Sequence, residues 1–198
     1  MTLRKINTVL LVLIILINAY VLLTPFTPRL VYWWQNRDGH RQQALTAQLH
    51  ATDAVTNRAQ ANTHPDGVVI PSMSLDQFIH EGPVSTTYRN LDQGVWRWPN
   101  GSTPDKGGNT VLLGHRFTYT HPKGVLYFMD KVRLGDEIGV WWSGKRYLYK
   151  VSSITTVPPT DTSILAPTTD SRLTIYTCTP LWKPVNRLVV VAKLEGES

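Results

Sequence analysis

Two neighbouring segments decide the fold of this chain: SRLTIYTCTPLW at residues 171–182 and NRLVVVAKL at residues 186–194. Polar and apolar side chains alternate along the first segment, and the second is rich in valine, so both are predicted to be strands. The short connection between them returns the chain beside the preceding strand, which predicts a hairpin. That hairpin would place Arg187 next to Cys178, the only cysteine in 198 residues.

Further strand patterns fill the chain from residue 66 onward. Short apolar or alternating runs, separated by Gly, Pro, Asp and Ser clusters, predict strands at 67–71, 84–89, 109–115, 137–142 and 146–157. Short helical pieces are predicted at 74–79, with Ser74 as its cap, and at 125–130. No long amphipathic helix alternates with the strands, which argues against a parallel doubly wound sheet. We expect an all-β domain with short helices, in which about eight strands close into a barrel without exposed edges.

A hydrophobic segment precedes this domain. Residues 8–23 are apolar apart from two polar side chains, and basic residues stand before them. A helix needs roughly 20 residues to cross a bilayer, a length that this run reaches together with its flanks. We expect a transmembrane signal anchor at 8–26, a cytoplasmic N-terminus at 1–7 and, at 30–34, aromatics that settle at the membrane interface. A cleaved signal peptide is the alternative, although no convincing small-x-small site follows the run.

Residues 27–64 are predicted to be a juxtamembrane stalk before a catalytic domain at 65–198. Most of this segment is rich in Gln, Ala, Thr and Asn with only a weak apolar stripe, so we expect a partly helical stalk that buries little. The spacing of His40, His50 and His64 fits no metal site, and these side chains are expected to be solvated.

Cys178 has two competing interpretations. A lone cysteine can be a small buried hydrophobe. An exported chain, however, usually pairs its cysteines, and this thiol has no partner in the sequence. It also stands at a strand end before a Thr-Pro turn, where side chains meet a cleft. These two features favour a nucleophilic thiol.

A nucleophilic thiol needs a base and a group that stabilises an oxyanion. His115 is the candidate base because it closes the run NTVLLGH at another strand end. His121, in a Tyr-Thr-His-Pro turn six residues later, is its rival. Arg187 is the candidate cation, nine residues past the cysteine. Each residue taken alone is more often structural.

Taken together, these residues resemble a known set. TIYTC at 174–178 resembles the TLxTC signature of sortases, the membrane-anchored cysteine transpeptidases of Gram-positive-type cell surfaces, with Ile175 in place of leucine. LLGHR at 112–116 resembles the segment that carries the sortase histidine, and NRLVVVA at 186–192 resembles the strand that carries the arginine. The order of the three residues also matches, and the resemblance covers roughly residues 68–194.

The resemblance implies a sortase-type barrel and a transpeptidation mechanism. Cys178 would attack the Thr–Gly carbonyl of an LPxTG-like sorting signal, with Arg187 stabilising the oxyanion and His115 protonating the departing amine. An amine from peptidoglycan or its lipid-linked precursor would then resolve the thioester. Thr177 is a candidate for a hydroxyl or amide in the substrate groove, and the connection at 158–170 is a candidate wall of that groove.

Two segments bear on the subfamily. GHRFTY at 114–119 leans toward class E-like sortases, while CTPLWKPVNRL at 178–188 also resembles the pilus-polymerising class. We favour attachment of proteins to the cell wall. The alternatives are a pilin-polymerising sortase, a cysteine peptidase, and an inert membrane-tethered β-domain that binds a surface partner. An L,D-transpeptidase is disfavoured, because the cysteine of such enzymes lies in a Ser-x-Gly-Cys context, whereas Cys178 lies in IYTCTP.

The expected compartment is the cell membrane, with a single span and an extracellular catalytic domain. The expected partners are proteins with an LPxTG-like signal, a cell-wall amine and the membrane. Nucleic acid is not expected, since the formal charge of +6 divides into +4 over residues 1–64 and only +2 over residues 65–198. No cofactor is expected, and a calcium site at Asp161 and Asp170 is disfavoured.

Overall fold

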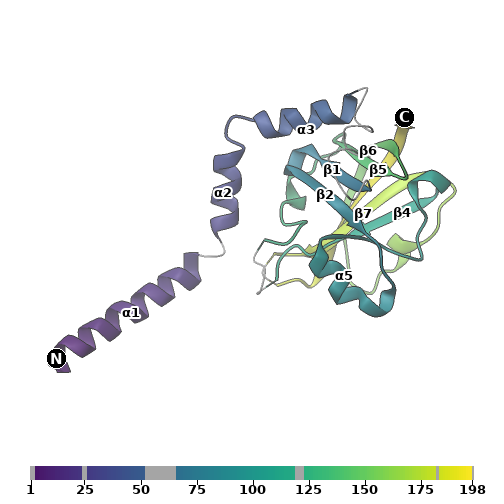
Figure 1. The fold of residues 1–198 in the computed structure, drawn as a ribbon. Helices are drawn as coiled ribbons and strands as arrows, with labels where there is room; N and C mark the ends of the chain where they lie inside the picture. The colour runs from purple at the N-terminus through teal and green to yellow at the C-terminus, as the bar shows by residue number, and fades with distance from the viewer. Residues whose placement is uncertain (1–2, 24–25, 52–65, 119–122, 182, 198) are drawn as a thin grey trace. The chain divides into compact units, whose positions relative to one another are not determined.

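The computed structural model describes residues 3–23, 26–51, 66–118, 123–181 and 183–197 (Figure 1). They divide into two compact units, Met1–Asp38 and Gly39–Ser198. The first unit contains α1 (Leu3–Leu23) and α2 (Thr27–Gln35). Among the described residues one helix, Arg4–Leu23, is long and apolar enough to cross a membrane, and it overlaps the predicted anchor.

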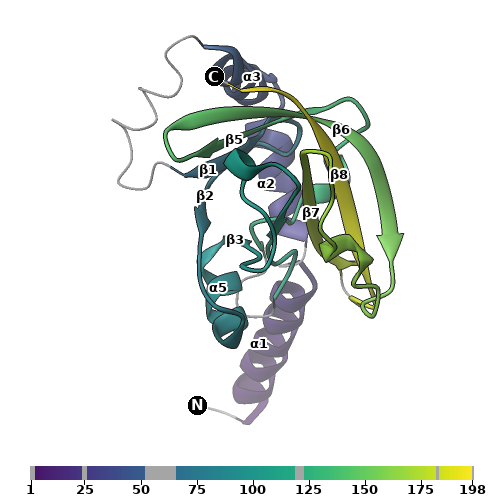
Figure 2. The ribbon, with the colours of Figure 1, turned by 90° about the vertical axis from the view of Figure 1, so that its right-hand side faces the viewer.

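The second unit is built around a closed β-barrel (Figure 2). Its described strands are β1 (Gly67–Ile70), β2 (Leu75–His80), β3 (Val95–Arg97), β4 (Asn109–Leu113), β5 (Glu137–Trp142), β6 (Lys145–Val157), β7 (Arg172–Thr179) and β8 (Asn186–Glu197). They are paired around the barrel in the order β1-β2-β3-β4-β7-β8-β6-β5. The prediction of an all-β barrel with about eight strands and short helices is therefore confirmed.

The interior of the barrel is filled by large side chains that alternate along the strands. The largest fully buried ones include Leu112, Ile138, Tyr147 and Leu173. Because successive side chains of a strand point to opposite faces, the side chains before and after each of these positions point out of the barrel. The predicted helical piece at 125–130 is a run of turns that leads into η5 (Met129–Lys131).

Residues 74–79 form most of strand β2 instead of the predicted helix. Ser74 has a φ of +54°, so it turns the chain out of η2 (Pro71–Met73) and does not cap a helix. β2 then pairs antiparallel with β1 and parallel with β3. Two neighbouring strands thus satisfy the backbone of this segment, and such tertiary pairing overrides a weak local preference.

Residues 84–89 were expected to form a strand, and this prediction is wrong. They form η3 (Val84–Thr86) and the start of α5 (Thr87–Gln93). The Thr86 hydroxyl donates to the Pro83 carbonyl (3.1 Å), and the Thr87 hydroxyl donates to the Val84 carbonyl (2.6 Å). Local bonds from threonine to the backbone compete with a strand ladder, so alternation was a misleading signal here.

Helix α3 (His40–His50) packs against the barrel, so the expectation that the stalk buries little is wrong for this helix. Leu45 and Leu49, one helical turn apart, are buried against Val69 and Trp141. Arg146 Nη1 also donates to the carbonyl of Ala51 at 2.7 Å, just beyond the helix. The second unit therefore begins well before the predicted boundary at residue 65, while residues 52–64 lie outside the described residues.

The histidines of this segment differ in their surroundings. His50 Nε2 lies 2.8 Å from Glu137 Oε2, so this side chain is paired and is not simply solvated as expected. His40 is exposed, as expected, and His64 lies outside the described residues.

Replacing Leu49 with alanine is expected to lower the free energy of unfolding by about 2–4 kcal/mol, because it removes a buried side chain and leaves a cavity. Urea unfolding of the full chain in detergent, followed by tryptophan fluorescence, measures this change. Gln43→Ala is the matched control, since Gln43 is exposed on the same helix. An unchanged unfolding midpoint for Leu49→Ala would show that α3 does not contribute to the folded domain.

Candidate active site

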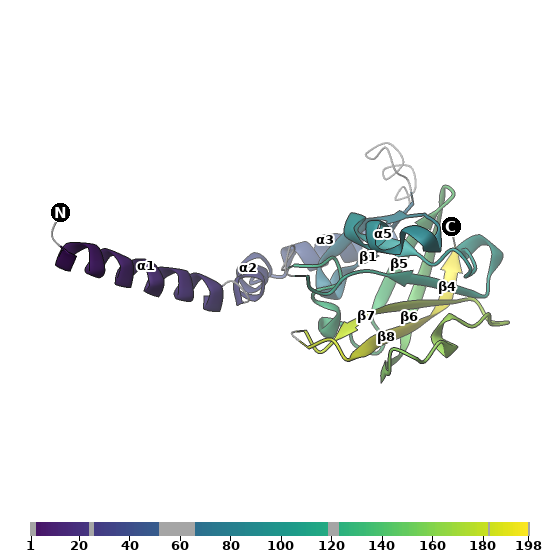
Figure 3. The same ribbon diagram turned by 90° about the horizontal axis from the view of Figure 1, so that it is seen from below.

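Three strand ends meet at one edge of the barrel. β4 and β7 run parallel, in register from Asn109 opposite Arg172 to Leu113 opposite Tyr176. β8 runs antiparallel beside β7 (Figure 3). The C-terminal ends of β4 and β7 therefore lie next to the start of β8, so residues that are distant in sequence come together at this edge.

Cys178 and Arg187 are directly opposite each other in the β7–β8 ladder. Opposed residues project from the same face of a sheet, with Cβ atoms typically about 4.5–5.5 Å apart. Leu173, Ile175 and Thr177 of β7 are buried, whereas Cys178 is only partly buried. The predicted hairpin is thus present, and it sets the thiol beside the arginine on the outer face of β7.

The Arg187 guanidinium has hydrogen-bonding capacity to spare at this edge. Among the described residues its hydrogen bond is from Nη1 to the Asn186 carbonyl (3.3 Å), which leaves Nε and Nη2 for a bound group. Tyr176 lies on the same outer face of β7. Burial raises the pKa of Tyr176, although the positive charge of Arg187 opposes that rise. The phenol is therefore neutral at neutral pH and does not cancel the charge of Arg187.

His115 follows the last residue of β4 by two positions. Continuing the β4–β7 register by the same two positions brings it level with Cys178. Its side chain is 23% exposed, and Nε2 lies 3.5 Å from a carboxylate oxygen of Asp92 in α5. The rival candidate, His121, lies outside the described residues.

Glycine at position 124 allows the following loop to pack against the histidine backbone. A Cβ at Gly124 would overlap the carbonyl group of His115. The Leu126 N–H donates to the same carbonyl at 2.9 Å, and the Gly124 N–H donates to the carbonyl of Arg116 at 3.2 Å. This close approach fixes the backbone of His115 although the residue lies beyond the end of its strand.

Thr177 has a structural role that differs from the predicted one. Its side chain is 2% exposed, and its hydroxyl donates to the Gly114 carbonyl at 2.8 Å. The hydroxyl is therefore turned toward β4 and is occupied, so it is not offered to a substrate groove. A contribution of the Thr177 amide stays a prediction. The bond instead joins the segment that carries His115 to the strand that carries Cys178.

Arg116 is a buried cation that the sequence analysis did not single out. It is 6% exposed. Its Nη1 donates to the Thr179 hydroxyl at 2.9 Å, and its Nη2 lies 3.0 Å from Asp130 Oδ1. Its Nε donates to the Tyr127 carbonyl at 3.4 Å. The residue after the histidine is thus tied to the residue after the cysteine.

Replacing Arg116 with methionine is expected to destabilise the fold by about 1–3 kcal/mol, since it removes the bonds of a buried guanidinium to Thr179, to Asp130 and to the carbonyl of Tyr127. Acyl transfer by the folded protein is expected to fall about tenfold to a hundredfold, because a shift of about 1 Å between reacting groups costs that much. Arg133→Met is the matched control, because Arg133 is exposed and bonds to neighbouring carbonyls. Thermal unfolding measures the loss of stability, and an activity assay below the unfolding midpoints of both variants measures the loss of acyl transfer separately. Full activity of folded Arg116→Met would contradict the positioning role.

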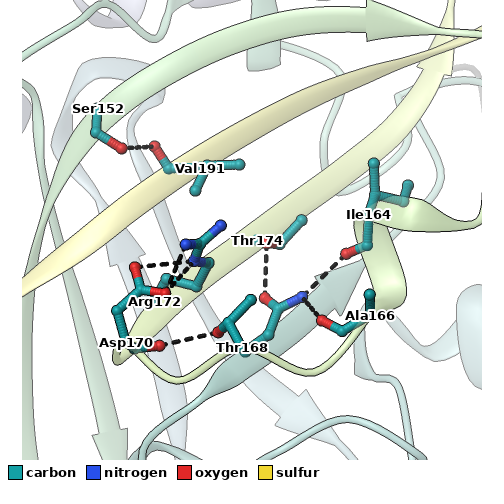
Figure 4. A network of polar contacts seen from close by, with 9 residues as sticks. Ser152, Ile164, Ala166, Thr168, Asp170, Arg172, Thr174 and Val191 are labelled. Atoms are coloured by element: carbon teal, nitrogen blue, oxygen red, sulfur yellow. Dashed lines mark hydrogen bonds and ion pairs between the residues drawn. The ribbon is translucent and has the colours of Figure 1, made fainter.

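The connection between β6 and β7 is tied to the barrel by Asn109, whose partners Ile164, Ala166 and Thr174 are labelled in Figure 4. Asn109 is buried, and its amide nitrogen donates to the carbonyls of Ile164 and Ala166, each at 3.0 Å. Its amide oxygen accepts from the Thr174 hydroxyl at 2.7 Å. η6 (Ser163–Leu165) is therefore held beside the first residue of β4, which lies opposite Arg172 at the end of β7 remote from Cys178. A groove wall at 158–170 stays a prediction.

The two acidic residues considered for calcium have protein partners. Asp161 accepts the backbone N–H of Ser163 at 3.0 Å, and Asp170 forms an ion pair with Arg172 (Figure 4). Hydrogen bonds from Ser163 lower the pKa of Asp161, and those from Arg172 lower the pKa of Asp170. In the part of the chain that the structure describes, no three His, Cys, Asp or Glu side chains gather as metal ligands would.

Comparisons with known proteins agree with this architecture. A family model described as the sortase domain matches residues 68–195, which is more than half of the chain. Sortase SrtE1 of Streptomyces coelicolor is 29% identical over 185 residues, covering 83% of this chain and 51% of that protein. Sortase A of Listeria monocytogenes is 29% identical over 155 residues, covering 76% of this chain and 66% of that protein. The chain thus spans between half and two thirds of the length of these relatives.

A solved structure supports the same assignment. The crystal structure of Streptococcus agalactiae sortase C1 matches with a TM-score of 0.59 and 28% identity, covering 67% of this chain and 68% of that chain. The family model covers the barrel from β1 to β8, including the three strand ends described above. The chain therefore belongs to the sortase family.

Proposed function

We propose that this chain is a cysteine transpeptidase that cleaves an LPxTG-like sorting signal between Thr and Gly and transfers the acyl group to a cell-wall amine. The observation that carries the proposal is the direct pairing of Cys178 with Arg187 at the barrel edge that also holds His115. These residue types supply a nucleophile, an oxyanion stabiliser and an acid–base group. Membership of the sortase family, whose members are cysteine transpeptidases, supports the same roles.

Acylation begins with the Cys178 thiolate. Its sulfur attacks the carbonyl carbon of the substrate threonine, a C–S bond forms, and an electron pair moves onto the carbonyl oxygen. The free N–H groups of Arg187 stabilise this oxyanion. The intermediate collapses to a thioester as the C–N bond breaks, and His115 donates a proton to the departing glycine amine.

Deacylation reverses the roles. Neutral His115 accepts a proton from the incoming amine, whose nitrogen attacks the thioester carbonyl. The oxyanion is again stabilised by Arg187, and Cys178 leaves as a thiolate. An amide joins the substrate protein to the amine, and the enzyme returns to its starting state.

The proposed setting is the cell surface. Family membership supports membrane anchoring, and α1 is the candidate span. We propose a single span at residues 8–26, with residues 1–7 inside and the catalytic domain outside. The proposed partners are surface proteins with the sorting signal and an amine of peptidoglycan or its lipid-linked precursor. No cofactor takes part in the proposed reaction.

Two functions within the sortase family are candidates, wall anchoring and pilin polymerisation. Similarity to Sortase SrtE1 supports the class E-like assignment, and wall anchoring is the function that we favour. Similarity to Streptococcus pneumoniae Sortase C, whose structure is described with its pilin substrate specificity, makes pilin polymerisation the second candidate. One sorting-signal peptide offered with two competing amines, a cell-wall amine and a pilin lysine peptide, would separate wall anchoring from pilin polymerisation. Only a polymerising enzyme should prefer the lysine amine.

The test of the proposed function is an acyl-transfer assay on the full chain in detergent. Peptides of the LPxTG type, with Pro or Ala at the second position, are incubated with a small amine and analysed by mass spectrometry. An amide product supports the proposal and names the preferred signal. A hydrolysed acid as the sole product would indicate a peptidase. Uncleaved peptides together with a thiol that resists alkylation in the folded protein would favour the inert binding domain.

A further inference from the structure

Helix α2 has an exposed apolar face. Phe26, Leu30, Trp33 and Trp34 are 58%, 64%, 64% and 72% exposed. At 3.6 residues per turn these four positions fall within one face about 100° wide. Pro28 and Tyr32 fall on the opposite side of the helix. Arg29 lies on the flank between that side and the apolar face. Such a large, continuous apolar surface marks a place of interaction.

The neighbouring helix indicates what this face meets. α1 ends at Leu23 and α2 begins at Thr27. The four residue steps between them reach at most about 14 Å when extended. The headgroup layer on each side of the hydrocarbon core is about 5–8 Å thick. If α1 spans the bilayer, the first turn of α2 is therefore held in or close to this layer.

The composition of α2 suits that layer. Tryptophan prefers the membrane–water interface, where its ring is apolar and its N–H meets water. A helix of nine residues is marginal in water on its own. A surrounding that binds its apolar face stabilises it. With Arg29 as its one cationic side chain, α2 would depend on apolar burial more than on anionic lipid.

We propose that α2 lies in the plane of the lipid headgroup layer on the catalytic-domain side of the membrane, with Leu30, Trp33 and Trp34 toward the acyl chains. The partner is the bilayer itself. This inference rests on the proposed anchoring by α1. It goes beyond that proposal because it assigns a separate membrane-bound element between the anchor and the catalytic unit.

The test is a site-directed spin-label scan of the full chain in vesicles of phosphatidylcholine and phosphatidylglycerol. In a Cys178→Ser background, single cysteines are placed along residues 28–34 and, as a reference in α1, at Ile15→Cys. Collision with oxygen and with a water-soluble nickel complex reports the depth of each label. We expect labels at 30, 33 and 34 to lie about 5–10 Å below the phosphates. Labels at 28 and 32 should face water, giving a period near 3.6 residues.

The reference site separates the two proposals. A deep label at 15 with a uniformly aqueous scan of α2 would overturn the interfacial helix and keep the anchor. A label at 15 that is open to water would overturn both. Deep labels at every position of α2 would make it part of the span. Labels at 30, 33 and 34 that are shielded from both reagents would mean that protein covers the face, which also overturns the proposal.

Discussion

Replacing Cys178 with alanine is expected to lower acyl transfer by about 10⁴-fold or more, because it removes the atom that forms the covalent intermediate. The fold should be retained, since Cys178 is only partly buried and alanine fits the same strand. The measurement is the initial rate of amide formation, together with the thermal unfolding midpoint of each variant. Ser152→Ala is a control for a small side-chain truncation at an exposed position on β6, remote from the strand ends.

The contrary result for Cys178→Ala is retained cleavage of the sorting-signal peptide at the rate of the unaltered chain. That outcome would mean that another group is the nucleophile, and the pairing with Arg187 would then be structural. Loss of both activity and folding would not count as support, so the unfolding midpoint is part of the test. With folding intact, loss of the rate assigns the chemistry to the thiol.

Replacing Arg187 with alanine is expected to lower kcat and kcat/KM together by about 10²–10³-fold, which is the usual cost of removing an oxyanion donor. The kcat of Arg187→Lys should lie between that of the unaltered chain and that of Arg187→Ala, because lysine keeps the charge but loses the planar fork of N–H donors. Steady-state kinetics with one peptide and saturating amine provide both constants. A change confined to KM would instead show that Arg187 binds the peptide equally in the ground and transition states.

Arg172→Ala is the matched control for that experiment. Arg172 lies at the other end of β7, where it forms an ion pair with Asp170. This partly exposed pair should contribute little to stability, and its loss should leave kcat unchanged. Equal losses for Arg172→Ala and Arg187→Ala would contradict a specific role for Arg187 and point to a general effect of charge on the domain.

The barrel and the β7–β8 hairpin could be predicted from the sequence, because alternation and turn residues are local signals. The hairpin places Arg187 opposite Cys178, as the number of residues between them indicated. β3 (Val95–Arg97) gave no such signal, since three residues are too few to show a period. β2 was mistaken for a helix because its partners β1 and β3 are provided by the tertiary structure.

The alternation of side chains along β7 also argues against a groove role for the Thr177 hydroxyl. The pattern sets Leu173, Ile175 and Thr177 on one face of β7 and Cys178 on the other. A residue on the inner face cannot offer its hydroxyl to a groove on the outer face. The structure follows the pattern, with the hydroxyl bound to the carbonyl of Gly114.

The remaining site features depend on contacts between distant parts of the chain. Arg116 meets Thr179 and Asp130, which are 63 and 14 positions away, and no local pattern reveals such partners. The docking of α3 likewise needs Trp141 to receive its leucines. From the sequence, those leucines gave only a weak apolar stripe. Local sequence thus indicated which residues carry the chemistry, whereas tertiary contacts determine how they are held.

Acylation of Cys178 by a sorting-signal peptide is the step on which the proposed function depends, and intact-mass spectrometry detects it. The full chain is mixed with an LPxTG-type peptide without amine, quenched in acid and weighed, and the modified residue is located by digestion. We expect a mass increase equal to the peptide fragment that ends in threonine less one water, located on Cys178 and released by hydroxylamine. Peptide cleavage with the acyl group on another residue, or undiminished cleavage by Cys178→Ala, would contradict it.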